Sequence, residues 1–238
     1  MTAEKRQRSK RGDGERLGAD ILDAATQLLI ETGSAEAVSI RGVANRVGVT
    51  PPSIYLHYSD KEALLTAVVA RYLGQLDEEM TAAEADATTP LDAARAQGLA
   101  FVRFALATPE LYRLAAMTPS ESASDVDTVL NAAAFSHLED TVRRLQDEGY
   151  YPPGDPRPIA LQMLTIVHGV ASLLVAKPFL PWGDPIEYAD RVIGGACLGI
   201  ALTTGMDELP TGAQALETVR ALRGHIDDSG RSGAAHST

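Results

Sequence analysis

Cysteine and aromatic residues are scarce in this 238-residue chain, which has one cysteine and 5% aromatic side chains. A single thiol, Cys197, cannot form a disulfide framework or a multi-cysteine metal site, and it fits a reducing compartment. Neither a signal peptide nor a stop-transfer segment opens the sequence, so we expect a cytoplasmic protein. With 45% hydrophobic residues, the chain can form one substantial core or two modest ones.

The motifs of common enzyme classes are also missing. The sequence has no G-x-S-x-G elbow, no G-x-x-x-x-G-K-[ST] phosphate loop and no H-E-x-x-H helix. The segment GDGERLG, residues 12–18, has the wrong spacing for a dinucleotide fingerprint, and the five histidines share no metal-ligand spacing. We therefore expect no catalysis, no metal and no cofactor.

Acidic residues exceed basic ones, which gives a formal net charge of −11 at pH 7. Taken alone this argues against a nucleic-acid partner, but the excess is uneven. Residues 1–62 carry nine Lys/Arg and nine Asp/Glu, whereas the rest of the chain carries 12 and 23. Residues 1–16 form a basic arm that we expect to be disordered, either as a solvated tail or as a segment that approaches nucleic acid.

The sequence contains clear signals for helix starts. Thr or Asp precedes proline at six places, a pattern typical of an N-cap followed by the first helical residue. Apolar residues recur at helical intervals between these marks, so we predict an all-α fold of about nine helices. The predicted spans are 17–32, 39–46, 50–56, 60–84, 90–106, 109–117, 123–148, 157–176 and 185–204, with a possible short helix at 212–226. We assign residues 17–65 to a three-helix head, 66–205 to a larger helical body and 206–238 to a tail that is largely disordered after residue 227.

Residues 48–65, GVTPPSIYLHYSDKEALL, place two prolines and several hydrogen-bonding side chains ahead of a new helix. Gly48 supplies a turn and Thr50 caps a helix only two turns long, which is helix-turn-helix spacing over residues 39–58. Because Pro52 has no N–H, we expect Thr50 to cap through the amide of Ser53, which leaves the remaining amides for a phosphate. Ile54 then faces the core, and the side chains that project toward base edges are Ser53, Tyr55 and His57.

Several side chains of this segment admit a second interpretation. Tyr55, His57 and Tyr58 could simply pack the junction with the following helix. We favour packing for Tyr58 and a phosphate or base-edge role for the other two, because aliphatic side chains already supply the apolar contacts. Lys61 lies in the first turn of the next helix, where the helix dipole disfavours a cation, and a phosphate partner would explain it.

The stretch ILDAATQLLIETGSAEAVSIRGVANRVGVTPPSIYLHYSDKEALL resembles the N-terminal domain of the TetR family of bacterial transcriptional regulators. The resemblance covers roughly residues 17–65. It rests on an amphipathic first helix ended by Gly33, the second helix and turn SIRGVANRVGV, the recognition segment SIYLHY and the opening DKEALL of the linking helix. It implies a homodimer in which each subunit places its third helix in the major groove of one half of a near-palindromic double-stranded operator.

The resemblance also implies a DNA-facing set, which comprises Ser39, Arg41, Thr50, Ser53, Tyr55, His57 and Lys61, together with Pro51 and Pro52 at the start of the third helix. Arg41 is expected to bind phosphate, although an arginine on this helix can also be merely solvated. Many relatives have glycine at Pro52, an aromatic ring at Leu56 and phenylalanine at Tyr58. The base preference of the third helix therefore does not carry over.

The segment QMLTIVHGVASLLVAKPF, residues 162–179, is similar to the WHG type of TetR C-terminal domain, with Val167 in place of tryptophan. It and RVIGGACLGIAL, residues 191–202, are apolar almost all round. A transmembrane hairpin is the competing interpretation, but Gln162 and His168 interrupt the first segment and both are short for a span. We expect them instead to be buried against their own subunit and a second copy. The predicted interface contains Gly169, Leu173, Gly194, Gly195, Leu198 and Gly199.

The remaining helices of the body supply a candidate effector pocket, made of Phe101, Phe104, Leu111, Tyr112, Met117, Phe135, Met163 and His168. Each of these is individually more typical of ordinary core, but together they could wall a cavity for a small hydrophobic or amphipathic ligand. His168 is either a core histidine with one hydrogen bond or a group that orients the ligand.

These patterns together predict a dimeric one-component transcriptional regulator, a repressor by resemblance, that a small molecule releases from DNA. The alternative is an acidic helical protein-interaction module without sequence-specific DNA binding.

Overall fold

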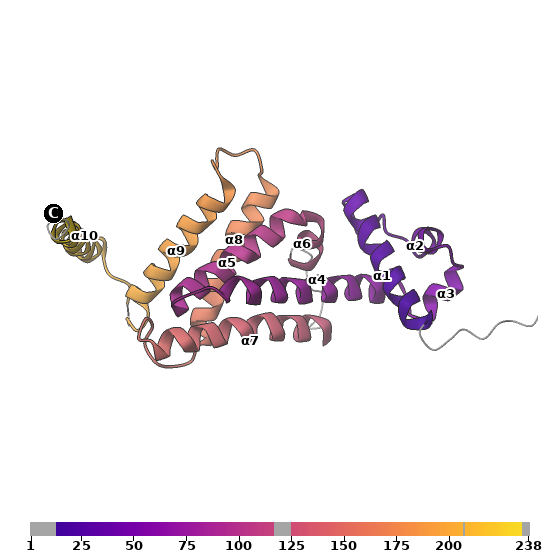
Figure 1. The fold of residues 1–238 in the computed structure, drawn as a ribbon, viewed down its shortest axis with the longest axis horizontal. Coiled ribbons are helices and arrows are strands. Elements are labelled where there is room, and N and C mark those ends of the chain that lie inside the picture. The colour runs from indigo at the N-terminus through magenta and orange to yellow at the C-terminus, as the bar shows by residue number, and fades with distance from the viewer. Residues whose placement is uncertain (1–12, 117–124, 207, 235–238) are drawn as a thin grey trace, which may run out of the picture.

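The computed structural model describes residues 13–116, 125–206 and 208–234, and within these ranges the protein is entirely helical, as predicted. Figure 1 shows a head of three helices at one end, a larger body, and the long helix α4 that runs from one into the other. The helices are α1 (Asp13–Thr32), α2 (Ile40–Val47), α3 (Pro51–Tyr55), α4 (Lys61–Glu84), α5 (Pro90–Ala107), α6 (Pro109–Ala116), α7 (Asp125–Asp147), α8 (Arg157–Ala176), α9 (Pro185–Thr203) and α10 (Gly212–Ala234).

The head folds around the aliphatic faces of α1, α2 and α3. Ile21 of α1, Val43 of α2 and Ile54 of α3 are fully buried, as the helical spacing predicts. Gly48 has a φ of +78° and ends α2, and its amide donates to the carbonyl of Ala44. Because that φ strains any residue with a Cβ, glycine suits the turn that joins the two helices.

Helix α4 begins beside α3 and its buried side chains belong first to the head and then to the body. The Asp60 carboxylate caps it by accepting from the Ala63 amide at 2.8 Å. Leu64 and Val68 are buried near its start, and Tyr72 and Leu76 are buried further along. One helix thus contributes to a hydrophobic core that continues from the head into the body.

The body is a bundle in which α5 is central, since it packs against α4, α7, α8 and α9. Figure 1 shows α7 lying alongside α4 on one side and the α8–α9 pair on the other. Two of the six Thr/Asp–Pro pairs, those at Thr89 and Asp184, cap helices as the pattern predicts, since each side chain accepts from backbone amides of the helix that follows. Among the described helices, α8 alone is long and apolar enough to cross a membrane, yet 39% of its most apolar window is buried in the body.

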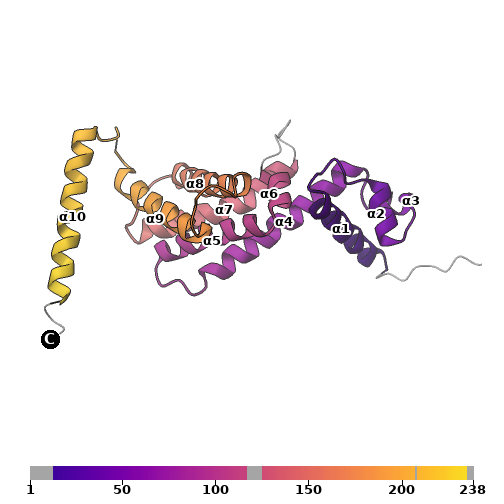
Figure 2. The same cartoon turned by 90° about the horizontal axis from the view of Figure 1, so that it is seen from above.

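The two ends of the described chain extend further as helix than predicted. Helix α1 starts at Asp13, within the segment expected to be a disordered arm, and α10 reaches Ala234 rather than ending near residue 226. Alanine, leucine and arginine, which favour helix, are frequent in the first half of α10. Figure 2 shows α10 standing away from the body, and its side chains up to residue 224 are exposed apart from a half-buried Ala215.

Candidate DNA interface and effector cavity

The start of α3 differs from the expected phosphate site. The Thr50 side chain makes no cap hydrogen bond to an amide, and its hydroxyl lies 3.2 Å from the Ser53 hydroxyl instead. The Ser53 amide donates to the Thr50 carbonyl at 2.9 Å. Since Pro51 and Pro52 have no N–H, none of the first three residues of α3 has an amide free for phosphate. The prediction of a cap through the Ser53 amide is therefore wrong.

The outer surface of α3 consists of large exposed side chains. Tyr55 is 53% exposed and Leu56, the residue after α3, is 85% exposed, whereas Ile54 of α3 is fully buried. His57 is exposed too, but a Cβ placed on Gly18 would lie 3.3 Å from its Nδ1, so the imidazole rests against the start of α1. These large exposed side chains, at the last residue of α3 and just beyond it, leave a projecting surface that can enter a groove.

Tyr58 and Lys61 both have partners within the head. The Tyr58 hydroxyl donates to the Gly18 carbonyl at 3.4 Å, and partial burial raises the pKa of its phenol. This geometry is the packing role favoured for Tyr58. Lys61 Nζ donates to the Glu36 carbonyl at 3.0 Å, which offers a reason for a cation at this position besides a phosphate.

The two predicted positions on α2 have different surroundings. Ser39 caps α2, because its hydroxyl accepts from the Gly42 amide at 3.1 Å. Arg41, two residues further on, is exposed at the same end of the helix. Arg46, in the last turn of α2, is instead held in an ion pair with Glu31, with Nη2 2.7 Å from the carboxylate. Arg41 is thus the more available of the two guanidinium groups.

A cluster of hydrogen bonds attaches the head to α4. Arg71 of α4 donates to the Asp23 carboxylate at 2.5 Å and to the Thr26 hydroxyl at 2.6 Å, both on α1. Its Nη2 also lies 3.3 Å from the Leu22 carbonyl. A guanidinium that binds three groups on one helix fixes the angle between α1 and α4.

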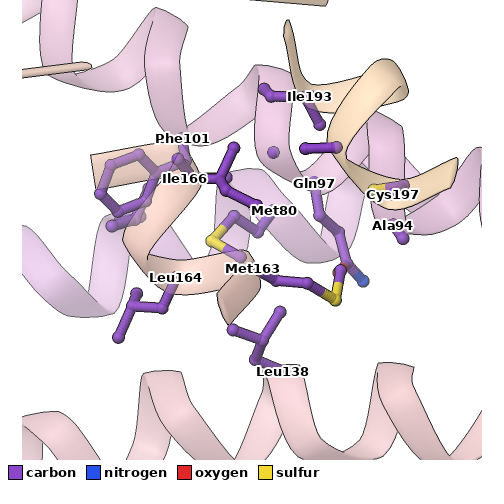
Figure 3. Close-up of a pocket in the computed structure, with 14 residues that line it drawn as sticks. Met80, Ala94, Gln97, Phe101, Leu138, Met163, Leu164, Ile166, Ile193 and Cys197 are labelled. Atoms are coloured by element: carbon purple, nitrogen blue, oxygen red, sulfur yellow. The ribbon is translucent and has the colours of Figure 1, made fainter. Parts of the chain in front are cut away.

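The body contains an apolar cavity of about 50 Å³ between α4, α5, α7, α8 and α9. Figure 3 shows the side chains that surround it. They are Leu76, Met80, Ala94, Gln97, Gly98, Phe101, Leu138, Met163, Leu164, Ile166, Val167, Ile193, Ala196 and Cys197. Burial raises the pKa of the Cys197 thiol, since a thiolate would be poorly solvated there. The cavity therefore has a low-polarity wall, as a site for an apolar ligand requires.

Only part of the predicted pocket lies at this cavity. Phe101 and Met163 line it. Phe104 instead stacks on Tyr72, with ring centroids 4.8 Å apart. Leu111 is buried, and Phe135 is half-buried against the same core. Met117 lies outside the described residues.

Tyr112 and His168 form a separate cluster at the edge of the body. The Tyr112 hydroxyl is 3.3 Å from His168 Nδ1 and donates to the His168 carbonyl at 3.3 Å. The Phe101 ring meets His168 edge-on, with centroids 4.8 Å apart, and so bridges this cluster and the cavity. Burial lowers the pKa of His168, which favours the neutral imidazole. These contacts fit the interpretation of His168 as a core histidine.

Gln97, the polar side chain of the cavity, was not among the predicted pocket residues, and it is 1% exposed. Its amide nitrogen donates to Glu84 of α4 at 2.5 Å and lies 3.0 Å from His137 Nε2 of α7. Its amide oxygen accepts from the Thr141 hydroxyl at 3.1 Å. The available signal was the position of Gln97 at helical spacing between Ala93 and Phe101, on the buried face of α5.

An exposed apolar stripe crosses α8 and α9. Leu173 is 52% exposed and Leu198 is 57% exposed, and Leu161 and Leu202 continue the stripe at 54% and 39%. The predicted interface glycines are all partly or fully exposed on these helices, namely Gly169, Gly194, Gly195 and Gly199. Solvent-facing leucines beside glycines let another backbone approach closely.

The helix-turn-helix head and the cavity-bearing helical body together define a transcriptional regulator that binds DNA. Two family models match the chain, bacterial regulatory proteins of the tetR family over residues 21–68 and the tetracyclin repressor-like C-terminal domain over residues 94–195. The chain belongs to the TetR family of regulators, as its sequence predicted. Members of this family are transcription factors that bind DNA and are not enzymes. No curated protein matches the sequence.

Solved structures share this fold at low sequence identity. A protein of unknown function from Rhodococcus sp. RHA1 is 23% identical, with a TM-score of 0.66 over 86% of this chain and 100% of its own. A TetR family transcription regulator from Marinobacter aquaeolei VT8 is 21% identical, with a TM-score of 0.60 over 79% and 98%. The fatty acid degradation regulator FadR from Bacillus halodurans is 17% identical, with a TM-score of 0.63 over 76% and 97%.

Proposed function

We propose that the protein is a homodimeric repressor in the cytoplasm, that it binds a near-palindromic operator, and that a small apolar effector releases it. The observation that carries this proposal is the position of α4. Its first residue follows the recognition segment closely, while Leu76 and Met80 line the cavity. With 24 residues, α4 is a lever of about 36 Å between the two sites.

The apolar stripe on α8 and α9 supports the dimer. Leucines that are half exposed in one chain become buried when two copies pack these helices face to face, and most such self-contacts are two-fold. The same contact would bury the apolar face that gives α8 its membrane-like composition. Two heads related by a two-fold axis would then meet two half-sites of opposite orientation.

In the DNA complex, α3 lies in the major groove. Tyr55 and Ser53 contact base edges, and Ser39 and Arg41 at the start of α2 contact the backbone, with Thr50, His57 and Lys61 beside them. The prolines give α3 a fixed entry angle, while the absence of free amides at its start leaves phosphate contacts to side chains and to α2. Recognition by α3 therefore depends on side chains more than on its backbone.

The effector role rests on the contacts between the cavity and α4. A ligand that fills the cavity presses on Leu76 and Met80, and the Arg71 cluster passes any movement of α4 to α1. A ligand shifts the equilibrium only by its preference for one position of α4, and coupling of this kind is typically worth about 1–3 kcal/mol.

Selection from a random DNA pool, followed by footprinting of the selected fragment, tests the DNA part of the proposal. We expect two half-sites of inverted sequence whose centres lie about 34–36 Å apart, or a multiple of that distance. Protection of one asymmetric site by a monomer would contradict both the dimer and the operator. Binding without any sequence preference would favour a protein-interaction module instead.

A further inference from the structure

We propose that the cavity selects uncharged apolar molecules that carry a hydrogen-bond donor, such as aliphatic alcohols or phenols, and that the amide oxygen of Gln97 accepts from that donor. This inference rests on the proposed effector role of the cavity and gives the effector a chemical class.

The wall of the cavity contains one side-chain amide. Of the 14 lining residues shown in Figure 3, Gln97 is the only one with a side-chain nitrogen or oxygen, and none is Asp, Glu, Lys or Arg. Transfer of a charged group into such a site without a paired partner costs far more than transfer of a hydroxyl that finds one hydrogen bond. The described wall thus favours a ligand without charge.

The orientation of the Gln97 amide follows from its partners. A carboxylate only accepts hydrogen bonds, so the nitrogen must face Glu84, at 2.5 Å. The same nitrogen lies 3.0 Å from His137 Nε2, and the opposite ring nitrogen, Nδ1, faces the Asp77 carboxylate at 3.7 Å. The Asp77 carboxylate favours the tautomer with the hydrogen on Nδ1, in which Nε2 accepts from the Gln97 amide. In that tautomer both amide hydrogens are engaged, and a ligand acceptor finds no donor on this side chain.

The amide oxygen of Gln97 keeps accepting capacity. A carbonyl oxygen has two lone pairs, and the Thr141 hydroxyl donates to this one at 3.1 Å. Thr141 is fully buried and its hydroxyl oxygen accepts from Arg144. Its single hydrogen is shared between the Gln97 oxygen and the His137 carbonyl, also 3.1 Å away, so it occupies at most one lone pair of the Gln97 oxygen. Gln97 can accept one further hydrogen bond from a ligand in the cavity.

The charges behind the amide disfavour an anionic ligand. Glu84 lies directly beyond the Gln97 nitrogen, and Arg144, the cation closest to it in the described structure, already donates to that carboxylate at 2.7 Å. A ligand carboxylate would face Glu84 across one side chain with no free cation to pair with. Desolvation of the neighbouring Cys197 thiol acts in the same direction, against negative charge.

Three six-carbon probes separate the effect of the hydrogen-bond donor from the effect of charge in the intact protein. They are 1-hexanol, its isomer methyl pentyl ether, which has no donor, and hexanoate, which is anionic at neutral pH. Labelling the methionine methyl groups with carbon-13 lets NMR follow Met80 and Met163 at the cavity wall during titration. We expect 1-hexanol to bind about two- to tenfold more tightly than the ether. Hexanoate should bind more than about a hundredfold more weakly than 1-hexanol.

The variant Gln97→Met should remove the preference for 1-hexanol over the ether. Gln146→Met is the matched control, since Gln146 donates to the Pro152 carbonyl at 2.9 Å away from the cavity, and it should keep the preference. Hexanoate or the ether binding as tightly as 1-hexanol in the wild-type protein would overturn the inference alone. If no probe shifts Met80 or Met163, the effector role of the cavity fails with it, while DNA selection and footprinting still test the regulator independently.

Discussion

The head and the body are both helical, but they place their polar side chains in opposite ways. In the head, Tyr55 and Arg41 point to solvent from short helices, and the core behind them is aliphatic. In the body, Gln97 and Thr141 are buried and bind each other beside an apolar cavity. The head is therefore suited to a polar partner outside the protein, and the body to an apolar partner within it.

The largest expected effect concerns the outer surface of the body. The change Leu198→Glu places a charge in the proposed interface, and since that charge would be buried without a partner, the dimer dissociation constant should rise more than about a hundredfold. Sedimentation velocity across a range of concentrations measures it. Leu56→Glu, at an even more exposed leucine of the head, should leave the dimer intact. If both variants remain equally dimeric, α8 and α9 do not form the interface.

A matched pair of tyrosines tests which side chain of the head contacts DNA and which one packs against α1. Tyr55→Phe should change which operator sequences are preferred, because a lost base-edge contact is worth about 1–3 kcal/mol. Tyr58→Phe removes a hydroxyl that binds the Gly18 carbonyl, so it should lower thermal stability and keep the sequence preference. Selection from the same DNA pool with each variant gives the answer. Unchanged preference in Tyr55→Phe would remove Tyr55 from the recognition surface.

A matched pair of arginines tests backbone contacts from α2. Arg41→Ala should weaken binding about equally for all DNA sequences and reduce the slope of log affinity against log salt by about one, as loss of one phosphate contact does. Arg46→Ala should have little effect, since its guanidinium is paired with Glu31. Fluorescence anisotropy at several salt concentrations measures both slopes. Equal slopes for the two variants would argue against a phosphate contact from Arg41.

The smallest expected effect is the pH dependence contributed by His168 in the body. Burial lowers the pKa of the folded imidazole, so below about pH 6.5 the unfolded chain binds the proton more readily. Protonation of His168 therefore favours the unfolded chain, and the free energy of unfolding should fall as the pH drops through this range. Urea unfolding at several pH values should show a shallower fall in His168→Gln. An unchanged slope would mean that the histidine titrates normally.

The sequence predicted more of the head than of the body, and the reason is physical. Gly48 and Ile54 act through local geometry, which spacing along one chain segment reveals, and the structure bears out both roles. The prediction for the first turn of α3 was wrong in one detail, because the Ser53 amide donates to the Thr50 carbonyl and not to the Thr50 side chain.

The wall of the cavity, in contrast, is assembled from five helices. Gln97, Ile193 and Cys197 meet there because α5 and α9, which are far apart in the sequence, pack against each other. Periodicity identifies which face of a helix is apolar, but it does not tell which of those side chains border a void and which fill the core. Phe101 and Met163 were predicted and do line the cavity, whereas Phe104, which was also predicted, lies against Tyr72.

The most direct test of the central claim, that the cavity controls the head through α4, is the affinity of the protein for its selected operator when the cavity is filled by mutation. Ala94 lines the cavity and is 3% exposed, so Ala94→Met acts as a tethered apolar occupant, and Ala107→Met at the exposed end of α5 is the control. Fluorescence anisotropy should show about 5- to 150-fold weaker operator binding for Ala94→Met, and wild-type binding for the control. Wild-type affinity in an Ala94→Met protein that remains folded and dimeric would contradict the claim.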